Sequence, residues 1–126
     1  MDKKLDLPDH IRQCGEDYLA AFNGRDLAGY GNALHYPFVS IIGPEVTVLY
    51  AADGLHPGMF DYMEQTGWDR SVWESARIIQ SGPAKAHLAV HFTRRRKDDS
   101  VIEAIDCVYA ITHENGKWGM KACTMI

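Results

Sequence analysis

The sequence lacks the marks of several large protein classes. It has no excess of positive charge, because 13 Lys and Arg stand against 17 Asp and Glu, which gives a net charge of −4 at pH 7. Nucleic-acid-binding domains usually gather a basic excess on one face. No apolar run approaches the length that crosses a bilayer, and residues 1–6 contain no apolar core of a secretory signal. We therefore expect a cytoplasmic protein that binds neither nucleic acid nor membrane.

Cysteine is also scarce, and common cofactor motifs are missing. The three cysteines, Cys14, Cys107 and Cys123, are an odd number without a C-x-x-C pair, which predicts buried free thiols in a reducing compartment. Cys107 and Cys123 become cross-strand neighbours in some registers of the last hairpin, which permits a disulfide without implying one. The sequence contains no P-loop, dinucleotide fingerprint, nucleophile elbow or H-E-x-x-H pattern, so we expect neither a metal site nor a cofactor.

What is present indicates one α+β domain. The chain has 126 residues, of which 46% are hydrophobic and 24% charged, close to the globular average. A helical stripe of apolar residues follows Pro8: Ile11, Cys14, Tyr18, Leu19 and Phe22. A weaker helix is predicted over residues 26–34, ended by Pro37, and a third over residues 57–66. Two glycines in the second helix lower its intrinsic stability.

Six strands are predicted between and after these helices. They cover residues 38–42, 46–51, 72–80, 84–94, 101–112 and 118–125. The separators between the last four strands are short and rich in turn-forming residues, which indicates antiparallel hairpins because a parallel crossover needs a dozen residues or more. Helices gathered beside a mainly antiparallel six-stranded sheet define an α+β fold.

This element order resembles the nuclear transport factor 2-like superfamily, which includes ketosteroid isomerases, scytalone dehydratase and SnoaL-type cyclases. The local similarity is carried by EDYLAAFNGRDL at residues 16–27 and by AIDCV and NGKW at residues 104–108 and 115–118. The resemblance implies three helices across a strongly curved sheet, a cone-shaped pocket with an apolar floor, and a homodimer that pairs through the sheet. It says little about activity, because this scaffold supports unrelated chemistries.

Asp106 is the most informative polar residue, because it lies in the middle of an apolar strand. A buried carboxylate needs a partner or a proton. Ketosteroid isomerases carry an aspartic acid on the equivalent strand that stays neutral and donates to an oxyanion, and a tyrosine at the position of Tyr18. The resemblance therefore implies that Tyr18 and Asp106 form a donor pair, provided that Asp106 lies beneath the helices. The base position of these isomerases corresponds to Ile42 and Gly43, which accept no proton, so steroid isomerisation by that route is excluded.

His91 offers an alternative base. A turn at Asp98 and Asp99 makes the numbers of facing residues in the flanking strands sum to about 197, which places His91 opposite Asp106. The carboxylate would orient the imidazole in a catalytic acid–base dyad, or the two would form a structural hydrogen bond on an outer face. The other face of these strands is more apolar, and the helices could equally cover that one.

Three further residues are candidates for ligand binding. Tyr36 would line the mouth of the pocket, Trp68 would cap it and Ser40 would face it from the first strand; packed tyrosine and tryptophan side chains are the alternatives for the first two. The basic run at residues 94–97 is followed at once by two aspartates, which favours a solvated hairpin tip over an anion site.

Together these residues predict binding of a small, largely apolar ligand with one or two polar groups. One hypothesis is a cofactor-independent isomerase, dehydratase or cyclase in which Asp106 and Tyr18 polarise a carbonyl and His91 moves a proton. The alternative is a non-catalytic ligand-binding or dimerisation domain. An adaptor for a protein partner has no support in the sequence beyond the fold itself.

Overall fold

The computed structural model describes residues 5–126 of the chain; the predicted absence of a signal rests partly on residues 1–4, which lie outside this part. The described elements, in chain order, are α1 (Asp9–Asn23), α2 (Leu27–Asn32), β1 (Leu34–Ile42), β2 (Glu45–Leu49), the short 3₁₀ helix η1 (Ala52–Gly54), α3 (Met59–Glu64), β3 (Arg70–Gly82), β4 (Lys85–Arg95), β5 (Val101–Glu114) and β6 (Lys117–Met125). Within residues 5–126, no helix is both long and apolar enough to cross a membrane.

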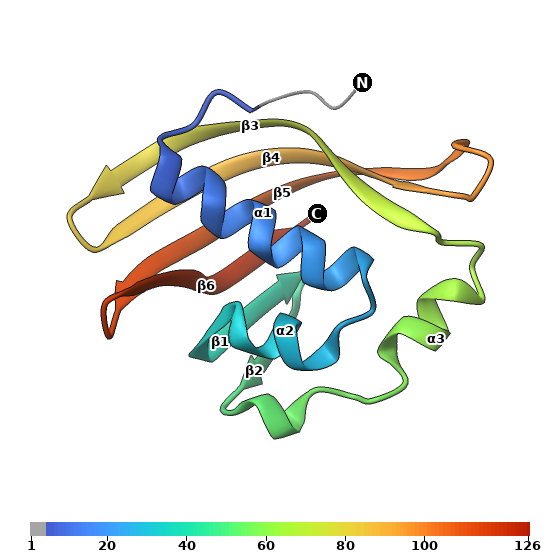
Figure 1. Cartoon of the computed structure of the whole chain (residues 1–126), viewed down its shortest axis with the longest axis horizontal. Coiled ribbons are helices and arrows are strands. Elements are labelled where there is room, and N and C mark those ends of the chain that lie inside the picture. Colours follow the sequence, from blue (N-terminus) through green and yellow to red (C-terminus); the bar gives the residue numbers. More distant parts are fainter. Residues whose placement is uncertain (1–4) are drawn as a thin grey trace.

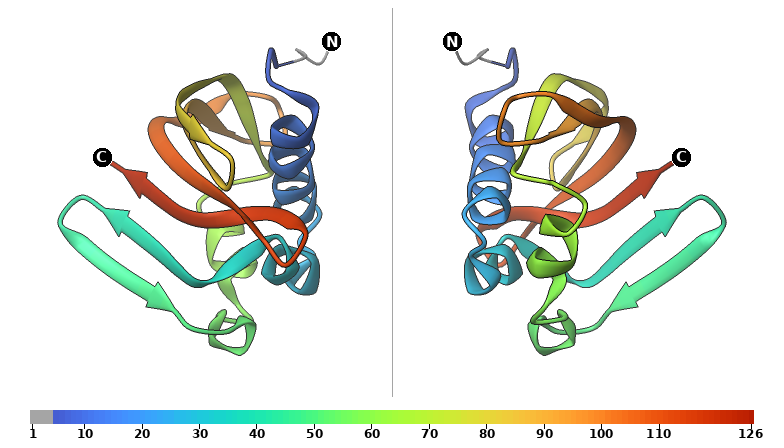
Figure 2. Two further views of the ribbon diagram at one scale, coloured as in Figure 1. Left: turned by 90° about the vertical axis from the view of Figure 1, so that its left-hand side faces the viewer. Right: turned by 90° about the vertical axis from the view of Figure 1, so that its right-hand side faces the viewer.

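The six strands form one open, mainly antiparallel sheet, which confirms the predicted α+β class. Their order is β2-β1-β6-β5-β4-β3, and β1 and β6 are the parallel pair. The antiparallel ladders β3–β4, β4–β5 and β5–β6 each contain register shifts, and such bulges bend a strand and increase its twist. The sheet curves accordingly, and the β1–β2 hairpin projects on the side away from α1 (Figure 2).

Helix α1 lies along one face of this sheet (Figure 1), and the core fills the space between them. The predicted stripe is confirmed in its centre, because Ile11, Cys14 and Tyr18 are buried. Opposite the helix, the even-numbered residues 86–92 of β4 and the odd-numbered residues 107–111 of β5 are buried. The core therefore takes the face of β5 that carries Cys107, Tyr109 and Ile111, and Leu88 is its fully buried partner on β4.

The segment around Pro37 differs from the prediction. The second helix ends at Asn32 rather than near Leu34, and Pro37 lies inside β1 after a cis peptide bond. Proline has no amide hydrogen for a sheet ladder and is tolerated at strand irregularities. Pro37 lies between Leu34 and Val39, where the register of β1 against β6 shifts.

The three cysteines are free and buried, as predicted. Cys107 pairs with Met125 across the last hairpin, while Cys123 pairs with Tyr109. The two thiols are thus diagonal neighbours. Burial raises the pKa of Cys14 to about 11 and that of Cys107 to about 12, so both are protonated and behave as small apolar side chains near neutral pH.

Candidate functional site

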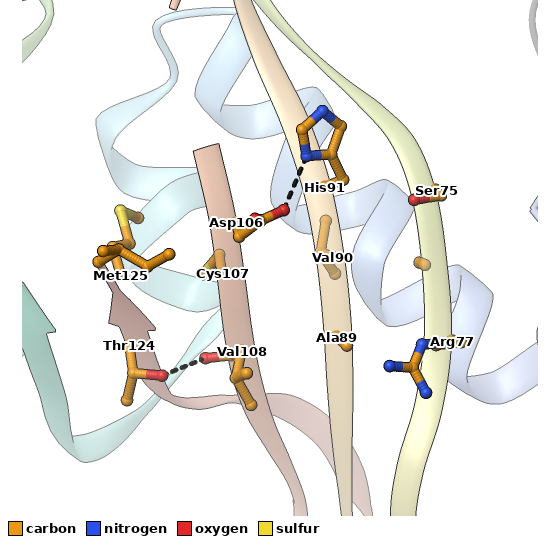
Figure 3. Close-up of a pocket in the computed structure, with 12 residues that line it drawn as sticks. Ser75, Arg77, Ala89, Val90, His91, Asp106, Cys107, Val108, Thr124 and Met125 are labelled. Carbon is orange, nitrogen blue, oxygen red and sulfur yellow. Dashed lines mark hydrogen bonds and ion pairs between the residues drawn. The ribbon is translucent and has the colours of Figure 1, made fainter. Parts of the chain in front are cut away.

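Two cavities lie on opposite faces of the sheet. The inner cavity, with a volume of about 250 Å³, lies between the helices and the covered face of the sheet. The outer cavity, with a volume of about 600 Å³, is more open and lies over β3, β4, β5 and the end of β6. In Figure 3 the side chains of the outer cavity stand in front of the strands, whereas α1 passes behind them.

The inner cavity has aromatic walls supplied by α1, α2 and the middle of the sheet. Tyr18 is its centre: the Tyr18 ring centroid lies 5.4 Å from that of Tyr30 and 5.5 Å from that of Tyr109. The full lining comprises Tyr18, Leu19, Phe22, Tyr30, Phe38, Ser40, Ile42, Met59, Met63, Ser71, Trp73, Phe92, Arg94, Tyr109, Cys123 and Met125. Large rings of this kind favour flat, apolar ligands.

The three tyrosines of this cavity are hydrogen-bond donors at neutral pH rather than bases. Burial, as the largest cause, raises the pKa of Tyr18 and of Tyr109 well above its ordinary value. Burial also raises the pKa of Tyr30 to about 12. A phenol that keeps its proton can donate to a ligand oxygen but cannot remove a proton from a ligand.

Arg94 brings a positive charge to the edge of the inner cavity. It follows Phe92 on the buried face of β4, and its guanidinium carbon lies 5.9 Å from the centre of the Phe92 ring. Its Nη1 donates to Glu103 Oε1 at 2.6 Å, but its Nε is buried without a hydrogen-bond partner. A buried donor without a partner is uncommon and needs an explanation.

Ser71 ties this edge of the cavity to the end of α1. Its backbone N–H donates to Asn23 Oδ1 at 2.9 Å, and its carbonyl accepts from Asn23 Nδ2 at 3.0 Å. Its hydroxyl accepts from Trp68 Nε1 at 3.0 Å. The two bonds with Asn23 fix the start of β3 against the end of α1, and the third ties Ser71 to Trp68.

Ser40 and Cys123 form the polar part of the sheet side of the inner cavity. The Cys123 thiol lies 3.5 Å from the Ser40 hydroxyl. Burial raises the pKa of Cys123, so the thiol stays protonated and is a weak donor. Ser40 and Tyr18 both line the inner cavity, and their binding roles remain predictions.

Tyr36 and Trp68 lie outside the lining of the inner cavity. The Tyr36 hydroxyl donates to the Gly31 carbonyl at 2.7 Å, which ties β1 to α2. Trp68 is 2% exposed, stacks on Phe60 and lies 4.2 Å beneath the Arg25 guanidinium. The structure therefore places Trp68 in the packed edge of the core rather than over the opening as a lid.

The predicted register between β4 and β5 is confirmed, because His91 faces Asp106. His91 Nδ1 lies 2.8 Å from Asp106 Oδ1 (Figure 3). Both belong to the outer cavity, with side chains 45% and 71% exposed. The expectation that Asp106 lies beneath the helices is wrong, because the larger odd-numbered side chains of β5 fill the core and turn the even-numbered ones outward.

This orientation also separates the expected donor pair. Tyr18 lines the inner cavity and Asp106 lines the outer one, with the sheet between them. The two side chains therefore cannot hold the same oxyanion. Within residues 5–126, no group of three or more His, Cys, Asp or Glu side chains is arranged to hold a metal ion.

Comparison with known proteins identifies the family behind this geometry. Residues 8–125 match the model of the NTF2-like protein family DUF6841. The chain belongs to this NTF2-like family. A comparison with the functionally curated proteins gives no match.

Solved structures share the fold of this NTF2-like chain. A protein of unknown function with a cystatin-like fold from Nostoc punctiforme is 16% identical, with a TM-score of 0.74 over 98% of this chain and 93% of that one. An NTF-2 like protein from Shewanella oneidensis is 12% identical, with a TM-score of 0.69 over 93% and 96%. A proposed ketosteroid isomerase from Shewanella frigidimarina is 8% identical, with a TM-score of 0.72 over 98% and 100%. At these identities the likeness shows the fold alone.

Among the inner-cavity residues that sequence reasoning did not name as site residues are Tyr30, Tyr109 and Arg94. Tyr30 lies in a helix with weak propensity, Tyr109 lies on the face of β5 opposite Asp106, and Arg94 belongs to a basic run interpreted as a hairpin tip. One signal was available for Tyr109, because it shares its face with Cys107 and Ile111. For Arg94 the signal was strand alternation after Phe92, which places residue 94 on the buried face.

Proposed function

We propose that this NTF2-like chain binds a small, mainly apolar ligand in the inner cavity. The observation that carries the proposal is a cavity of about 250 Å³ with aromatic walls and a few polar groups. A cavity of about 150 Å³ suffices for benzene in another protein, so this one has room for a substituted ring system. Pockets of this composition are typical of small-molecule sites.

The lining favours binding over acid–base turnover in the inner cavity. Its residues all lie in the described part of the chain, and they include no Asp, Glu or His. The phenols of Tyr18, Tyr30 and Tyr109 keep their protons, so none of them serves as a base near neutral pH. Binding without conversion is the function that these groups support best.

The test uses a neutral probe, 2-naphthamide, and tryptophan fluorescence, to which Trp73 in the cavity wall contributes. We expect saturable quenching and a rise in melting temperature with probe concentration. The variant Ser40→Phe fills the inner cavity and should abolish both effects. Ser75→Phe places the same side chain in the outer cavity and is the matched control.

Retained binding in Ser40→Phe, or equal loss in both variants, would contradict binding in the inner cavity. Circular dichroism and a cooperative melt of each variant exclude a folding defect as the cause. The absence of quenching and of a thermal shift with 2-naphthamide in the wild-type chain would also count against the proposal.

A second candidate function is general acid–base chemistry in the outer cavity. It is favoured by the 2.8 Å contact between His91 and Asp106 at the wall of a 600 Å³ cavity. Asp106 would orient the imidazole, and His91 would transfer the proton. Ligand fragments that shift the imidazole signals of His91 in the wild type, but not in Asp106→Asn, would support it. His87→Gln, on the same strand, is the control, and equal shifts in wild type and Asp106→Asn would contradict it.

A further inference from the structure

Helix α3 supplies one wall of the inner cavity through two methionines. Met59 and Met63 line the cavity and lie four residues apart, so they share one face of the helix. Every other lining residue comes from α1, α2 or the sheet. Methionine is unbranched and has three rotatable side-chain bonds, so it adapts its shape to a neighbour more easily than an aromatic ring does. The side chains of α3 therefore form the most adaptable wall of the cavity.

The α3 segment, which lies between two loops (Figure 1), has few polar ties to the rest of the described chain. Residues 56–67 hydrogen bond among themselves, and their one hydrogen bond to another part of residues 5–126 runs from Arg25 Nε to Glu64 Oε1 at 2.8 Å. These two side chains are 30% and 48% exposed, and exposed ion pairs contribute little to stability. The strands that form the opposite wall are instead joined by ladders of backbone hydrogen bonds.

One buried ring positions α3. Phe60 is the buried residue among residues 56–67, and its ring centroid lies 5.4 Å from that of Phe22 and 6.4 Å from that of Trp68. A helix of six residues is not stable on its own, so this packing fixes the place of α3. Glycines flank the helix at Gly58 and Gly67, and Gly67 has a φ of +92°, which glycine adopts without strain. The segment can therefore turn about the Phe60 ring.

The resting cavity matches a ligand with two fused rings. A cavity of about 150 Å³ holds benzene, and scaling this volume by carbon number gives about 250 Å³ for naphthalene and about 350 Å³ for anthracene. The inner cavity has a volume of about 250 Å³. Tyr18 shares hydrogen bonds with Tyr30 and with Tyr109, so these phenols require no polar group from the ligand. A ligand with three fused rings needs a wall that moves.

We propose, on the basis of the ligand-binding function above, that α3 is the adjustable wall of the inner cavity and that Met59 and Met63 determine the size of the ligand. The helix turns outward about Phe60, and the two methionines pack against the longer ligand. The cavity then accepts flat, mainly apolar ligands of two or three fused rings. The walls formed by α1 and the sheet keep their positions.

The experiment compares 2-naphthamide with anthracene-2-carboxamide, which carries the same amide and one more fused ring. Dissociation constants are measured by tryptophan fluorescence on the full chain. We expect the wild type to bind both probes, with constants within about tenfold of each other. Met63→Ala should tighten anthracene-2-carboxamide at least about fivefold and change 2-naphthamide by less than about threefold. Tyr62→Ala, on the same helix with a side chain that is 72% exposed, is the control and should change neither constant.

A variant outside the cavity lining tests the movement of the helix. Glu64→Ala removes the hydrogen bond from Arg25 and leaves the lining intact. We expect it to tighten anthracene-2-carboxamide about threefold and to leave 2-naphthamide unchanged, because α3 then turns more easily. Glu16→Ala removes the ion pair with Arg12 on α1 and is the matched control. This pair of variants keeps the proposal testable if Met63→Ala folds poorly.

Methyl NMR of the methionines reports the movement directly. Anthracene-2-carboxamide should shift the methyl signals of Met59 and Met63 more than 2-naphthamide does, since the longer probe displaces α3. Met120 is fully buried and lies outside the lining of the inner cavity. Its methyl signal should respond equally little to both probes.

The outcomes separate this proposal from the function on which it rests. Failure of anthracene-2-carboxamide to bind a chain that binds 2-naphthamide would overturn the adjustable wall while inner-cavity binding survives. Equal effects of Met63→Ala and Tyr62→Ala, or of Glu64→Ala and Glu16→Ala, would overturn it as well. Absence of binding of both probes, or binding of both that Ser40→Phe does not affect, would overturn the ligand-binding function itself.

Discussion

Gly15 is the position where one added methyl group tests the packing of α1 on the cavity wall. A Cβ at residue 15 would lie 2.8 Å from Trp73 Cζ3 and 3.0 Å from Trp73 Cη2, whereas carbon atoms pack best at about 3.5–4.0 Å. The Trp73 ring is 6% exposed and stacks on Tyr109 at a centroid distance of 5.3 Å. The indole therefore has a packed neighbour on its other side and cannot move freely.

The magnitude follows from two opposing terms. Replacing glycine by alanine in a helix contributes about 1 kcal/mol, and overpacking a core costs about 1–3 kcal/mol. We expect Gly15→Ala to lower the free energy of unfolding by about 1 kcal/mol, or about 3–5 °C in melting temperature. Because Trp73 lines the inner cavity, the near-ultraviolet dichroism of the variant should change as well.

Urea denaturation measures this free energy, and Ala20→Gly is the matched control. Ala20 is exposed on the same helix, so its replacement reports helix propensity alone and should cost about 1 kcal/mol. A gain in stability for Gly15→Ala equal to the loss in Ala20→Gly would refute the reasoning, because it would show that the indole moves aside without cost.

Three further predictions concern the phenol of Tyr30, the hydrogen bonds between Asn23 and Ser71, and the edge strand β2. The pKa of Tyr30 is 10.0 in an unfolded chain and about 12 in the fold. The free energy of unfolding is therefore unaffected by this group below pH 10, and it falls by about 3 kcal/mol as the pH rises toward 12. Tyr30→Phe should flatten this fall when the free energy is measured by urea denaturation at each pH, and an unchanged slope would contradict the assignment. Asn23→Ala leaves the buried Ser71 backbone amide without its acceptor and should lower the free energy of unfolding by about 1–3 kcal/mol, measured by thermal melting. Asn23→Asp keeps an acceptor and should lower it less. An equal loss in the two variants would contradict a stabilising role for the Asn23–Ser71 hydrogen bond. We also propose a homodimer that uses exposed apolar residues of the edge strand β2. Sedimentation should give twice the mass of one chain, and Val46→Lys should shift the protein toward the monomer. A wild-type monomer at micromolar concentration would contradict the proposal.

The order of elements was predictable from the sequence because turn residues and hydrophobic periodicity are local. The pairing of His91 with Asp106 was predictable from the turn at Asp98 and Asp99, because the turn of a hairpin fixes the register of the two strands that it joins. The boundary near Pro37 was not predictable, because it depends on a parallel partner from the other end of the chain.

Local patterns in the sequence could not decide which face of β5 the helices cover. Both faces carry apolar residues, and the even face with Ala104, Asp106 and Val108 looks like a pocket floor. The structure covers the odd face, because Tyr109 and Ile111 bury more apolar surface than their small even-numbered neighbours. The same alternation on β4 brings Arg94 to the inner cavity, a placement that its basic neighbours conceal in the sequence.

A crystal structure of the chain with 2-naphthamide tests the central claim most directly. The account predicts the naphthalene ring in the inner cavity against Tyr18 and Trp73. Ligand density in the outer cavity beside His91, or an inner cavity filled by protein side chains, would contradict it.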